Sequence, residues 1–298
     1  MAITAPTIWL DGKLVPAESA GAPLMGHAIQ RGSLVFDVGS FQAGALFRAR
    51  DHVRRFLRST RIVGIAVEQS EEALVEAAVA VVKASQASEG LVRWSAFFGV
   101  DNPDLIPRSE AARVAVAAQL YQDPPRAQPA PIKVATFEDA RKAGPRVLPP
   151  DAKAGAAYLG PMLARKRAIA AGADDVVLLD DDGDIAEGPI ANAFCVISNE
   201  LWTPPLGRIL PGITRDTVLT LAREMGIVVH EERISRAAFG GADEAFFSGT
   251  SLPLSPISQI DSRVLSAPGP VTARLLEAVR AARHGQTHPE WLTRFERT

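Results

Sequence analysis

Apolar residues recur at helical intervals in four stretches of the chain. From Ser70 to Ala87, strong helix formers combine with this spacing, which predicts a helix. The same pattern predicts helices near 159–171, 215–225 and 271–283, and Gly226 supplies a stop signal for the helix at 215–225. These four helices are separated by shorter segments whose pattern is that of strands and turns.

Short apolar runs predict strands in both halves of the chain. The run Val176–Leu179 is followed by a turn at Asp180–Gly183 and a second strand from Ile185 onward, which is a strand–turn–strand pattern. The Asp-Gly pairing explains these acids as turn residues rather than as metal ligands. Strands and helices follow one another in mixed order without regular alternation, which predicts an α+β fold rather than a doubly wound sheet.

A proline-rich segment predicts the boundary between two domains. Residues 121–131 contain four prolines, so they can form neither a helix interior nor a central strand. We interpret them as a linker between a first domain at 1–120, in which short strands alternate with helical stretches, and a larger domain at 132–298. A length of 298 residues is sufficient for two domains.

Composition and charge narrow the functional classes. Hydrophobic residues make up 47% and charged residues 22%, which is ordinary for a globular protein. A net charge of -2 gives no electrostatic reason to expect nucleic acid or an anionic membrane as a partner. No apolar run approaches a membrane span, and the N-terminus lacks a signal-peptide layout. The single cysteine, Cys195, is predicted to lie buried in a strand, and we expect a cytoplasmic protein. No metal site is predicted, because metal-ligand spacing is absent among the histidines His27, His52, His230, His284 and His288.

Lys153 is the first candidate for chemistry. It lies in the run Asp151–Tyr158, whose small residues would let a flat ring approach the backbone. A lysine amine can form a Schiff base with an aldehyde, and lysine is rarely buried without a partner. The structural alternative is a lysine at the start of the following helix, with its stem on the protein surface and its amine in water. Taken alone, the segment favours this alternative.

Further segments in the same half would suit one cofactor, pyridoxal 5′-phosphate. Glu187 follows the strand–turn–strand pattern and could keep a pyridine ring nitrogen protonated, although a strand-end glutamate is common. Thr214 is a candidate N-cap, so that Gly212–Thr214 would offer amide groups and a hydroxyl to a phosphate. Ser248–Ser251 is a second turn rich in hydroxyls. Each turn alone could be an ordinary capped turn, and an arginine would complete the phosphate site.

Taken in order, these motifs resemble the class IV aminotransferases, which include branched-chain aminotransferases, D-amino acid aminotransferases, (R)-amine transaminases and aminodeoxychorismate lyases. The resemblance covers nearly the whole chain, from Ile8–Pro16 through Phe47–Arg55 to the C-terminal motifs. It implies a small α/β domain, a larger domain with a barrel-like sheet, and a homodimer with sites near the interface.

The resemblance assigns roles residue by residue. Lys153 matches the Schiff-base lysine and is the expected catalytic residue, Tyr158 matches the tyrosine that hydrogen-bonds the ring hydroxyl, and Glu187 matches the ring-nitrogen acid. The phosphate site is matched by Arg55, Ile213, Thr214 and Thr250. Ser251 matches a position that lines the substrate pocket.

The N-terminal half mixes features of two subfamilies. Branched-chain enzymes usually carry tyrosine at the position of Arg31 and a Phe-Glu-Gly-Ile-Arg run, whereas this chain reads Phe36-Asp-Val-Gly-Ser40, which is similar to (R)-amine transaminases. Leu91-Val92-Arg93 instead resembles the Tyr-Ile-Arg segment of the branched-chain group. Arg31 and Arg93 are candidates for binding a substrate carboxylate in a forked geometry, or for surface or interface salt bridges. With Phe36 and Ser251, they form the expected substrate-binding set.

We therefore expect a transferase that moves an amino group between a branched-chain-like amino acid or an amine and a 2-oxo acid. Alternatives within the family are an (R)-selective amine transaminase, a D-amino acid transaminase or an aminodeoxychorismate lyase-like enzyme. An alternative of another class is a non-catalytic protein that binds pyridoxal phosphate as a carrier or regulator.

Overall fold

The computed structural model describes residues 2–99, 104–107, 112–121 and 129–296 of the chain. The chain divides into two compact units. The first unit contains Met1–Pro125, Ala152–Ala156 and Ala282–Thr298, and the second contains Arg126–Asp151 and Ala157–Ala281.

This division differs from the predicted domains of 1–120 and 132–298. The segments 152–156 and 282–298 group with the first unit, because strand pairing joins them to its sheet. Tyr121, the first residue of the predicted linker, is the last residue of a strand. Residues 122–128 of that linker lie outside the described residues.

Within the described residues, the first unit is built on a seven-stranded antiparallel sheet with the order β15-β4-β3-β5-β6-β1-β2. Its strands are β1 (Ala2–Leu10), β2 (Lys13–Pro16), β3 (Val35–Gln42), β4 (Ala45–Phe47), β5 (Glu89–Phe98), β6 (Ala112–Tyr121) and β15 (Leu292–Arg294). The C-terminal segment therefore returns to the N-terminal sheet, with Leu292 opposite Phe47 in β4.

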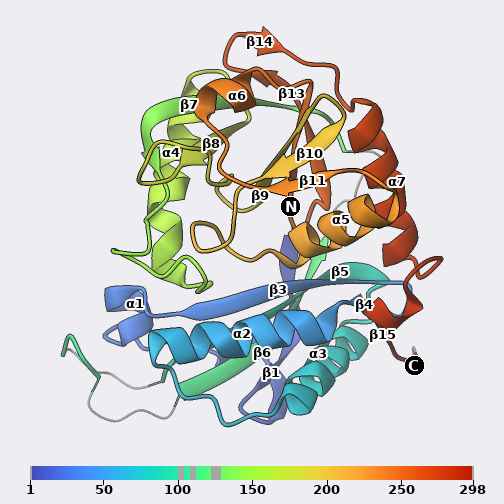
Figure 1. Cartoon of the computed structure of the whole chain (residues 1–298). Helices are drawn as coiled ribbons and strands as arrows, with labels where there is room; N and C mark the ends of the chain where they lie inside the picture. The colour runs from blue at the N-terminus through green and yellow to red at the C-terminus, as the bar shows by residue number, and fades with distance from the viewer. Residues whose placement is uncertain (1, 100–103, 108–111, 122–128, 297–298) are drawn as a thin grey trace. The chain divides into compact units, whose positions relative to one another are not determined.

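Two long helices of the first unit, α2 (Ala49–Val63) and α3 (Glu71–Ser85), pack against this sheet (Figure 1). The predicted helix at 70–87 is confirmed. It begins after Ser70, whose Oγ accepts a hydrogen bond from the Ala73 amide, as expected for an N-cap serine. The shorter helices are α1 (His27–Arg31), η1 (Ala17–Ser19) and η3 (Pro289–Trp291).

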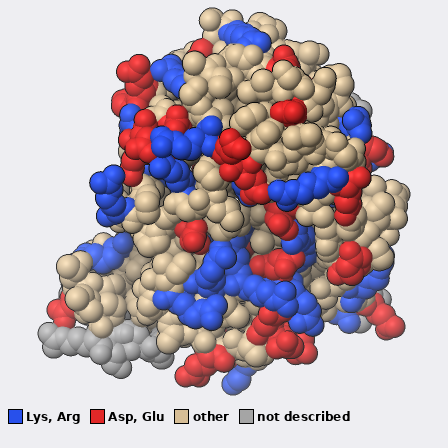
Figure 2. Space-filling model, viewed as in Figure 1, with Lys and Arg blue, Asp and Glu red and all other residues tan. Residues whose placement is uncertain are grey.

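Helix α2 separates an apolar face from a basic one. Val53 and Phe56 are fully buried, whereas the exposed side carries Arg50, Arg54, Arg58 and Arg61 at intervals of three or four residues. Figure 2 shows Lys and Arg side chains gathered over this helix with acidic side chains among them. The basic row is therefore partly neutralised; Arg54, for example, pairs with Glu71.

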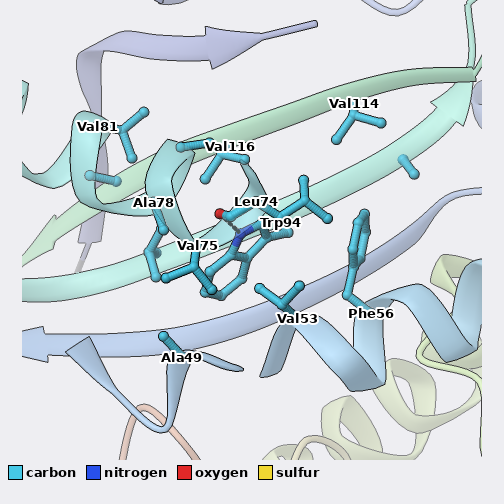
Figure 3. Packing of buried hydrophobic residues seen from close by; sticks show 14 of the residues in the cluster. Ala49, Val53, Phe56, Leu74, Val75, Ala78, Val81, Trp94, Val114 and Val116 are labelled. Carbon is cyan, nitrogen blue, oxygen red and sulfur yellow. Dashed lines mark hydrogen bonds between the residues drawn. The ribbon is translucent and has the colours of Figure 1, made fainter. Parts of the chain in front are cut away.

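The core of the first unit lies where α2 and α3 cover the sheet. Trp94 of β5 is fully buried, and its Nε1 donates a 2.9 Å hydrogen bond to the Leu74 carbonyl of α3. Figure 3 shows the ring among apolar side chains, with Val53 and Phe56 of α2 nearby. Burial of these apolar surfaces holds the sheet and both helices together.

Within its described residues, the second unit contains an eight-stranded sheet in the order β11-β10-β9-β12-β13-β7-β8, with β14 paired to β13. The pairs β10/β11, β13/β7 and β7/β8 are parallel and the others are antiparallel. The strands are β7 (Ile132–Arg141), β8 (Asp175–Leu179), β9 (Asn192–Ile197), β10 (Glu200–Thr203), β11 (Val229–Glu231), β12 (Glu244–Ser248), β13 (Leu254–Ile260) and β14 (Arg263–Val264). Mixed pairing with helices in irregular order confirms the α+β prediction.

The helices of the second unit confirm three sequence predictions. They are α4 (Leu159–Ala170), α5 (Ile213–Glu224), the short α6 (Arg236–Gly240) and α7 (Pro270–Arg283), whose last two residues group with the first unit. The turn η2 (Gly155–Tyr158) begins in the first unit and leads into α4. Gly226 has a φ of 71° just after α5, consistent with its predicted role as a stop. Cys195 is fully buried in β9, as predicted. No helix in the described part of the chain is long and apolar enough to cross a membrane.

Candidate functional site

The predicted site residues divide between the two units. Lys153, Arg55, Phe36, Arg31 and Arg93 belong to the first unit. The remaining predicted residues belong to the second: Tyr158, Glu187, Ile213, Thr214, Thr250 and Ser251.

Lys153 is held to the first unit through its backbone. Its carbonyl accepts a 3.0 Å hydrogen bond from the Phe36 amide, and its amide donates to the Ser59 Oγ at 3.1 Å. The half-buried side chain places Nζ 5.0 Å from the centroid of the Phe36 ring. Because the backbone of Lys153 is hydrogen-bonded to β3 and α2, only its side chain is available for large movement.

The small residues around Lys153 have a structural role that the sequence did not reveal. Ala154 forms a β-bridge with Val35, and the Gly155 amide donates a 2.7 Å hydrogen bond to the Leu34 carbonyl. A Cβ built on Gly32, which has a φ of 67°, would lie 3.3 Å from the Ala156 Cβ. Small side chains therefore allow this segment to lie directly against the start of β3.

Phe36 also contacts one of the two arginines predicted to bind a substrate carboxylate. The Arg93 Cζ lies 4.6 Å from the centroid of the Phe36 ring, a cation–π distance. The register explains this contact, because Phe36 pairs with Ser95 and Arg93 occupies the diagonal position on the same face. Arg31 is different: it is exposed at the end of α1, where its Nη1 donates to the Gln30 carbonyl.

Arg55, the predicted phosphate arginine, is 6% exposed and forms a forked ion pair with Asp37. Its Nε donates to Asp37 Oδ2 at 2.8 Å, and its Nη2 donates to Asp37 Oδ1 at 2.9 Å. His52 joins the pair through a 2.7 Å hydrogen bond from Nδ1 to Asp37 Oδ1. One helical turn separates His52 from Arg55, which directs both side chains from α2 toward β3.

The ionisation states of this cluster follow from its contacts. Burial alone would raise the pKa of Asp37, but the Arg55 charge and the His52 hydrogen bond outweigh it and hold that pKa well below its usual value. The pKa of His52 is lowered, chiefly by burial, although Asp37 acts in the opposite direction. Asp37 is therefore ionised, and a neutral His52 carries its proton on Nδ1.

Glu187, the predicted ring-nitrogen acid, is 8% exposed in the second unit. The predicted strand–turn–strand pattern is confirmed, because Leu179 bridges Ile185 and the Leu178 amide donates to the Glu187 carbonyl at 2.9 Å. The Glu187 Oε2 accepts hydrogen bonds from Asn192 Nδ2 at 3.0 Å and from the Leu210 amide at 3.1 Å. The carboxylate is thus fixed in one orientation.

Two residues of this arrangement escaped prediction from the sequence. Lys142, which follows β7, forms an ion pair with the Glu187 Oε1, and its side chain is only 14% exposed. Asn192 links the Glu187 carboxylate to the Leu210 carbonyl, to which its Nδ2 donates at 2.9 Å. The signal for Asn192 was its position at the start of the apolar run Asn192–Ile197, whereas Lys142 left no local signal because its partner is 45 residues away.

The second predicted phosphate segment begins α5, with one correction. Thr214 is not the N-cap. The helix begins after Gly212, whose carbonyl accepts from the Asp216 amide at 3.0 Å, and Thr214 is already a buried helical residue. Gly212 is the cap because the Asn192 Oδ1 would lie 1.9 Å from any Cβ built there. The amides of Ile213 and Thr214 nevertheless lie in the first turn, where amide groups lack helical partners.

The hydroxyl-rich turn follows β12. Ser248 ends that strand opposite Asn192 of β9, and its Oγ is buried without a hydrogen-bond partner among the described residues. Thr250 is half-buried, and Ser251 is exposed. Tyr158, at the end of η2, is half-buried.

These groups fit pyridoxal phosphate by their chemistry. The second unit offers a fixed carboxylate for a ring nitrogen, first-turn amides of a 12-residue helix, and a buried serine hydroxyl that lacks a partner among the described residues. The first unit offers a half-buried lysine amine against an aromatic ring. Among the residues that the structure describes, no group of three or more His, Cys, Asp or Glu side chains could hold a metal ion.

Sequence comparisons identify close relatives along the whole chain. A family model described as Amino-transferase class IV matches residues 34–260. The branched-chain-amino-acid aminotransferase of Pseudomonas aeruginosa is 34% identical over 297 residues, with 96% of each chain covered. The branched-chain-amino-acid aminotransferase of Escherichia coli K12 is 33% identical, with 95% of each chain covered.

Solved structures agree with this result. The branched-chain aminotransferase of Thermoproteus uzoniensis, crystallised with norvaline, is similar with a TM-score of 0.92 and 34% identity, covering 97% of this chain and 99% of that one. Another branched-chain amino acid aminotransferase, solved with pyridoxamine 5′-phosphate, has a TM-score of 0.91 and 32% identity, covering 98% of this chain and 99% of that one. This likeness bears out the expected fold, a small α/β domain and a larger domain with a barrel-like sheet.

Proposed function

Because the chain belongs to the class IV aminotransferases, we propose that it transfers amino groups between branched-chain-like amino acids and 2-oxo acids through Lys153. The enzyme is an aminotransferase that depends on pyridoxal phosphate. One observation carries the proposed roles: the Lys153 Nζ and the Arg93 guanidinium both lie against the Phe36 ring, 5.0 and 4.6 Å from its centroid. The two cationic groups thus contact one aromatic ring in the same unit, which supports the roles proposed for them.

The lysine performs the proton transfer in this proposal. Bound pyridoxal phosphate supplies an electron sink for the carbon that carries the transferred amino group. Lys153 would hold the cofactor through its Nζ, because a lysine amine can form a Schiff base with an aldehyde. As a free amine, the Lys153 Nζ would act as the general base that moves the proton at the substrate carbon. The backbone hydrogen bonds of Lys153 to Phe36 and Ser59 keep the rest of the residue in place during this movement.

Residues of each unit have a proposed role in binding and orienting the cofactor. Glu187 accepts a hydrogen bond from the protonated ring nitrogen, and its fixed carboxylate supports that role. Tyr158 donates to the ring hydroxyl. The phosphate is bound by Arg55, Ile213, Thr214 and Thr250; the helical position of Ile213 and Thr214 supports this role, because first-turn amides attract anions.

Substrate selection is assigned to residues of the first unit together with Ser251. Arg93 binds the substrate carboxylate in a forked geometry, and Arg31 is a second candidate for that contact. Phe36 and the buried Leu91 supply apolar surface for a branched side chain. The names of the relatives, which are branched-chain-amino-acid aminotransferases, support this substrate class over an amine.

The test is an absorbance spectrum of the purified enzyme before and after addition of amino donors. We expect a visible band of the lysine-bound cofactor that bleaches with L-valine, L-leucine or L-isoleucine and returns when a 2-oxo acid is added. If only D-amino acids or only (R)-amines bleach the band, that class of donor replaces branched-chain L-amino acids as the proposed substrate. A band that responds to no donor would support the carrier alternative.

The role of Lys153 needs its own variant. Lys153→Ala should abolish amino transfer without unfolding the protein, because the side chain is only half-buried and its backbone contacts remain. Lys166→Ala is the matched control, since Lys166 is exposed on α4. Turnover retained by Lys153→Ala at the level of the control would refute the assignment.

We also propose that the enzyme is a homodimer, as the family resemblance implies. Helix α4 exposes an apolar row at helical spacing, formed by Leu159, Met162, Leu163 and Ile169, each at least 55% exposed. Such a row is favourable when a second copy covers it. Light scattering should give a dimer mass, and Leu163→Glu should reduce it toward a monomer; a monomeric wild type would refute the proposal.

A cytoplasmic location is proposed on the basis of the single cysteine. Cys195 is the single cysteine of the chain and is free, so the chain can form no internal disulfide bond, as is usual in a reducing compartment. Fractionation of the source cells with an activity assay would test the compartment, and activity confined to a secreted fraction would contradict it.

A further inference from the structure

We propose that Asn192 is a positioning residue that couples the two ends of the cofactor site in the second unit. It holds the Glu187 carboxylate, assigned to the ring nitrogen, in a fixed relation to the turn before α5, assigned to the phosphate. The inference rests on the proposed roles of Glu187 and α5. It adds that the Asn192 side-chain amide makes binding of the ring nitrogen at Glu187 depend on binding of the phosphate at the start of α5.

The contacts of Asn192 form a closed set. Its Nδ2 donates to the Glu187 Oε2 at 3.0 Å and to the Leu210 carbonyl at 2.9 Å. The Leu210 amide donates to the same Glu187 Oε2 at 3.1 Å. Three groups therefore fix one another, and neither Glu187 nor Leu210 can shift without breaking two of these hydrogen bonds.

The orientation of the amide follows from its neighbours. Both acceptors, a carboxylate oxygen and a carbonyl oxygen, require N–H donors, and the Asn192 NH2 group has two. The reversed amide would place the Asn192 oxygen against two other oxygens. Because donation to a charged group is stronger than a neutral hydrogen bond, the observed orientation is the stable one.

The backbone of Asn192 is fixed as firmly as its side chain. It opens β9, pairs with Ser248 of β12, and forms a β-bridge with Glu187. The Gly188 amide donates to the Ala191 carbonyl at 2.7 Å and closes the short connection from Glu187. Asn192 therefore links three of the predicted cofactor segments of the second unit: Glu187, the turn before α5, and the end of β12.

Close packing adds a steric link to the start of α5. A Cβ built on Gly212 would lie 1.9 Å from the Asn192 Oδ1, so the amide rests directly against the residue that caps the helix. The donors on Nδ2 and the packing of Oδ1 act on the two sides of the same turn. Loss of Asn192 would leave room for this turn to move.

The ion pair of Glu187 does not depend on Asn192. Lys142 binds the Glu187 Oε1, whereas Asn192 binds Oε2. Removing the amide should therefore leave the carboxylate with its cationic partner and the Leu210 amide, but without the hydrogen bond that ties it to β9. Loss of Asn192 therefore alters the position of the carboxylate without altering its charge. If Asn192 couples the two ends of the site, its loss should lower cofactor affinity more when the phosphate is present.

The experiment compares two probes, pyridoxal 5′-phosphate and pyridoxal, which lacks the phosphate. Dissociation constants are measured by absorbance titration of the apoenzyme for the wild type and for Asn192→Leu, a change of similar shape that removes both hydrogen bonds. We expect the affinity for pyridoxal phosphate to fall about tenfold or more, since a hydrogen bond to a charged group contributes about this factor. The affinity for pyridoxal should fall less, so that the advantage conferred by the phosphate decreases.

A matched control removes a buried hydrogen bond elsewhere in the same sheet. The Thr203 Oγ1 donates to the Ala193 carbonyl at 2.9 Å, and Thr203→Val should lower stability without changing the ratio of the two dissociation constants. If Asn192→Leu does not fold, Asn192→Ala removes the same amide without requiring space for a branched side chain. The ratio of the two dissociation constants expected for Asn192→Ala is the same as for Asn192→Leu.

The outcomes distinguish the inference from the function on which it rests. An unchanged affinity for pyridoxal phosphate in the Asn192 variants overturns the positioning role. Equal loss for both probes overturns the coupling, because the phosphate end would then be unaffected. If the wild type itself binds no pyridoxal phosphate, the proposed function fails independently of Asn192.

Discussion

Asp37 and Arg55 form a forked ion pair in the interior of the first unit. Two hydrogen bonds of 2.8 and 2.9 Å join the guanidinium to the two carboxylate oxygens, and Asp37 is fully buried. An arginine assigned to a phosphate must be held in a fixed direction before the phosphate arrives. Asp37 provides this, since the forked geometry restricts both the position and the plane of the guanidinium.

Asp37→Asn should therefore destabilise the apoenzyme strongly. The amide keeps the shape of the carboxylate but leaves a buried guanidinium without its counter-charge, and breaking a buried pair in this way costs about 3–5 kcal/mol. Urea unfolding of the apoenzyme measures the change. Asp139→Asn is the control, because its ion pair with Arg167 is exposed and its loss should change stability much less. Equal losses in the two variants would contradict the role of Asp37.

His52 should make the protein less stable in mild acid. Its pKa is lowered in the folded state from 6.5, chiefly by burial, while Asp37 opposes this effect and the charges of Arg55 and Lys153 add to it. Between the two pKa values the unfolded chain binds more protons than the folded one, so stability falls as the pH drops below about 6.5. A single such group contributes at most about 1.4 kcal/mol per pH unit.

The measurement is the free energy of unfolding between about pH 7.5 and pH 5. In His52→Asn, an amide can still donate to Asp37 but does not titrate, so the decline over this range should become shallower. His284→Asn is the control at an exposed histidine. An identical slope in the wild type and in His52→Asn would show that His52 does not cause the acid sensitivity.

Local signals in the sequence were sufficient to predict α3, α4, α5 and α7, whereas α2 (Ala49–Val63) was not predicted. Helix α3 begins and ends within two residues of the predicted boundaries 70 and 87, because a cap residue and an apolar face are encoded by neighbouring residues. The N-cap of α5 was wrong for a related reason. Thr214 has suitable chemistry, but close packing of Asn192 against Gly212 determines where the helix begins.

Contacts between distant segments could not be predicted in this way. Ala154 bridges Val35, and Leu292 pairs with Phe47, so short segments of the predicted second domain join the first unit. Such pairs leave no periodic pattern in the sequence. The same limitation concealed Lys142, whose ion pair with Glu187 depends on β7 and β8 lying side by side.

The family motifs in the sequence supplied the candidate site residues. Lys153, Glu187 and the two turns were proposed as site residues from their order along the chain and from the family resemblance, and the cofactor followed from the same motifs. The network around them was not, because Asn192 and Asp37 act through hydrogen bonds to other residues rather than through a motif of their own. Their roles emerge only from three-dimensional contacts.

Arg93→Gln should selectively impair substrates that carry a carboxylate beside the amino group. Loss of the forked contact to a carboxylate should raise the KM for L-valine about tenfold or more. Isobutylamine, which is L-valine without its carboxylate, should react as slowly with the variant as with the wild type. Stopped-flow absorbance of the cofactor band measures the donor half-reaction with L-valine and with isobutylamine.

Arg31→Gln is the companion variant for this comparison. Arg31 is exposed at the end of α1, whereas Arg93 lies against the Phe36 ring, so loss of Arg31 should have the smaller effect on L-valine. If Arg31→Gln impairs the reaction of L-valine more than Arg93→Gln does, Arg31 is the residue that binds the substrate carboxylate. Equal impairment of L-valine and isobutylamine by Arg93→Gln would indicate that Arg93 supports the Phe36 ring instead.

Cys195 should be inert to thiol reagents while the protein remains folded. Its side chain is fully buried in β9, and burial raises the pKa of its thiol to about 12, whereas the thiolate is the reactive form. Iodoacetamide at about pH 8 should therefore label the native protein at the rate of global unfolding and label the guanidinium-unfolded chain rapidly. Mass spectrometry counts the labelled fraction in each state. Rapid labelling of the native protein would mean that β9 opens locally, and with it the strand that begins at Asn192.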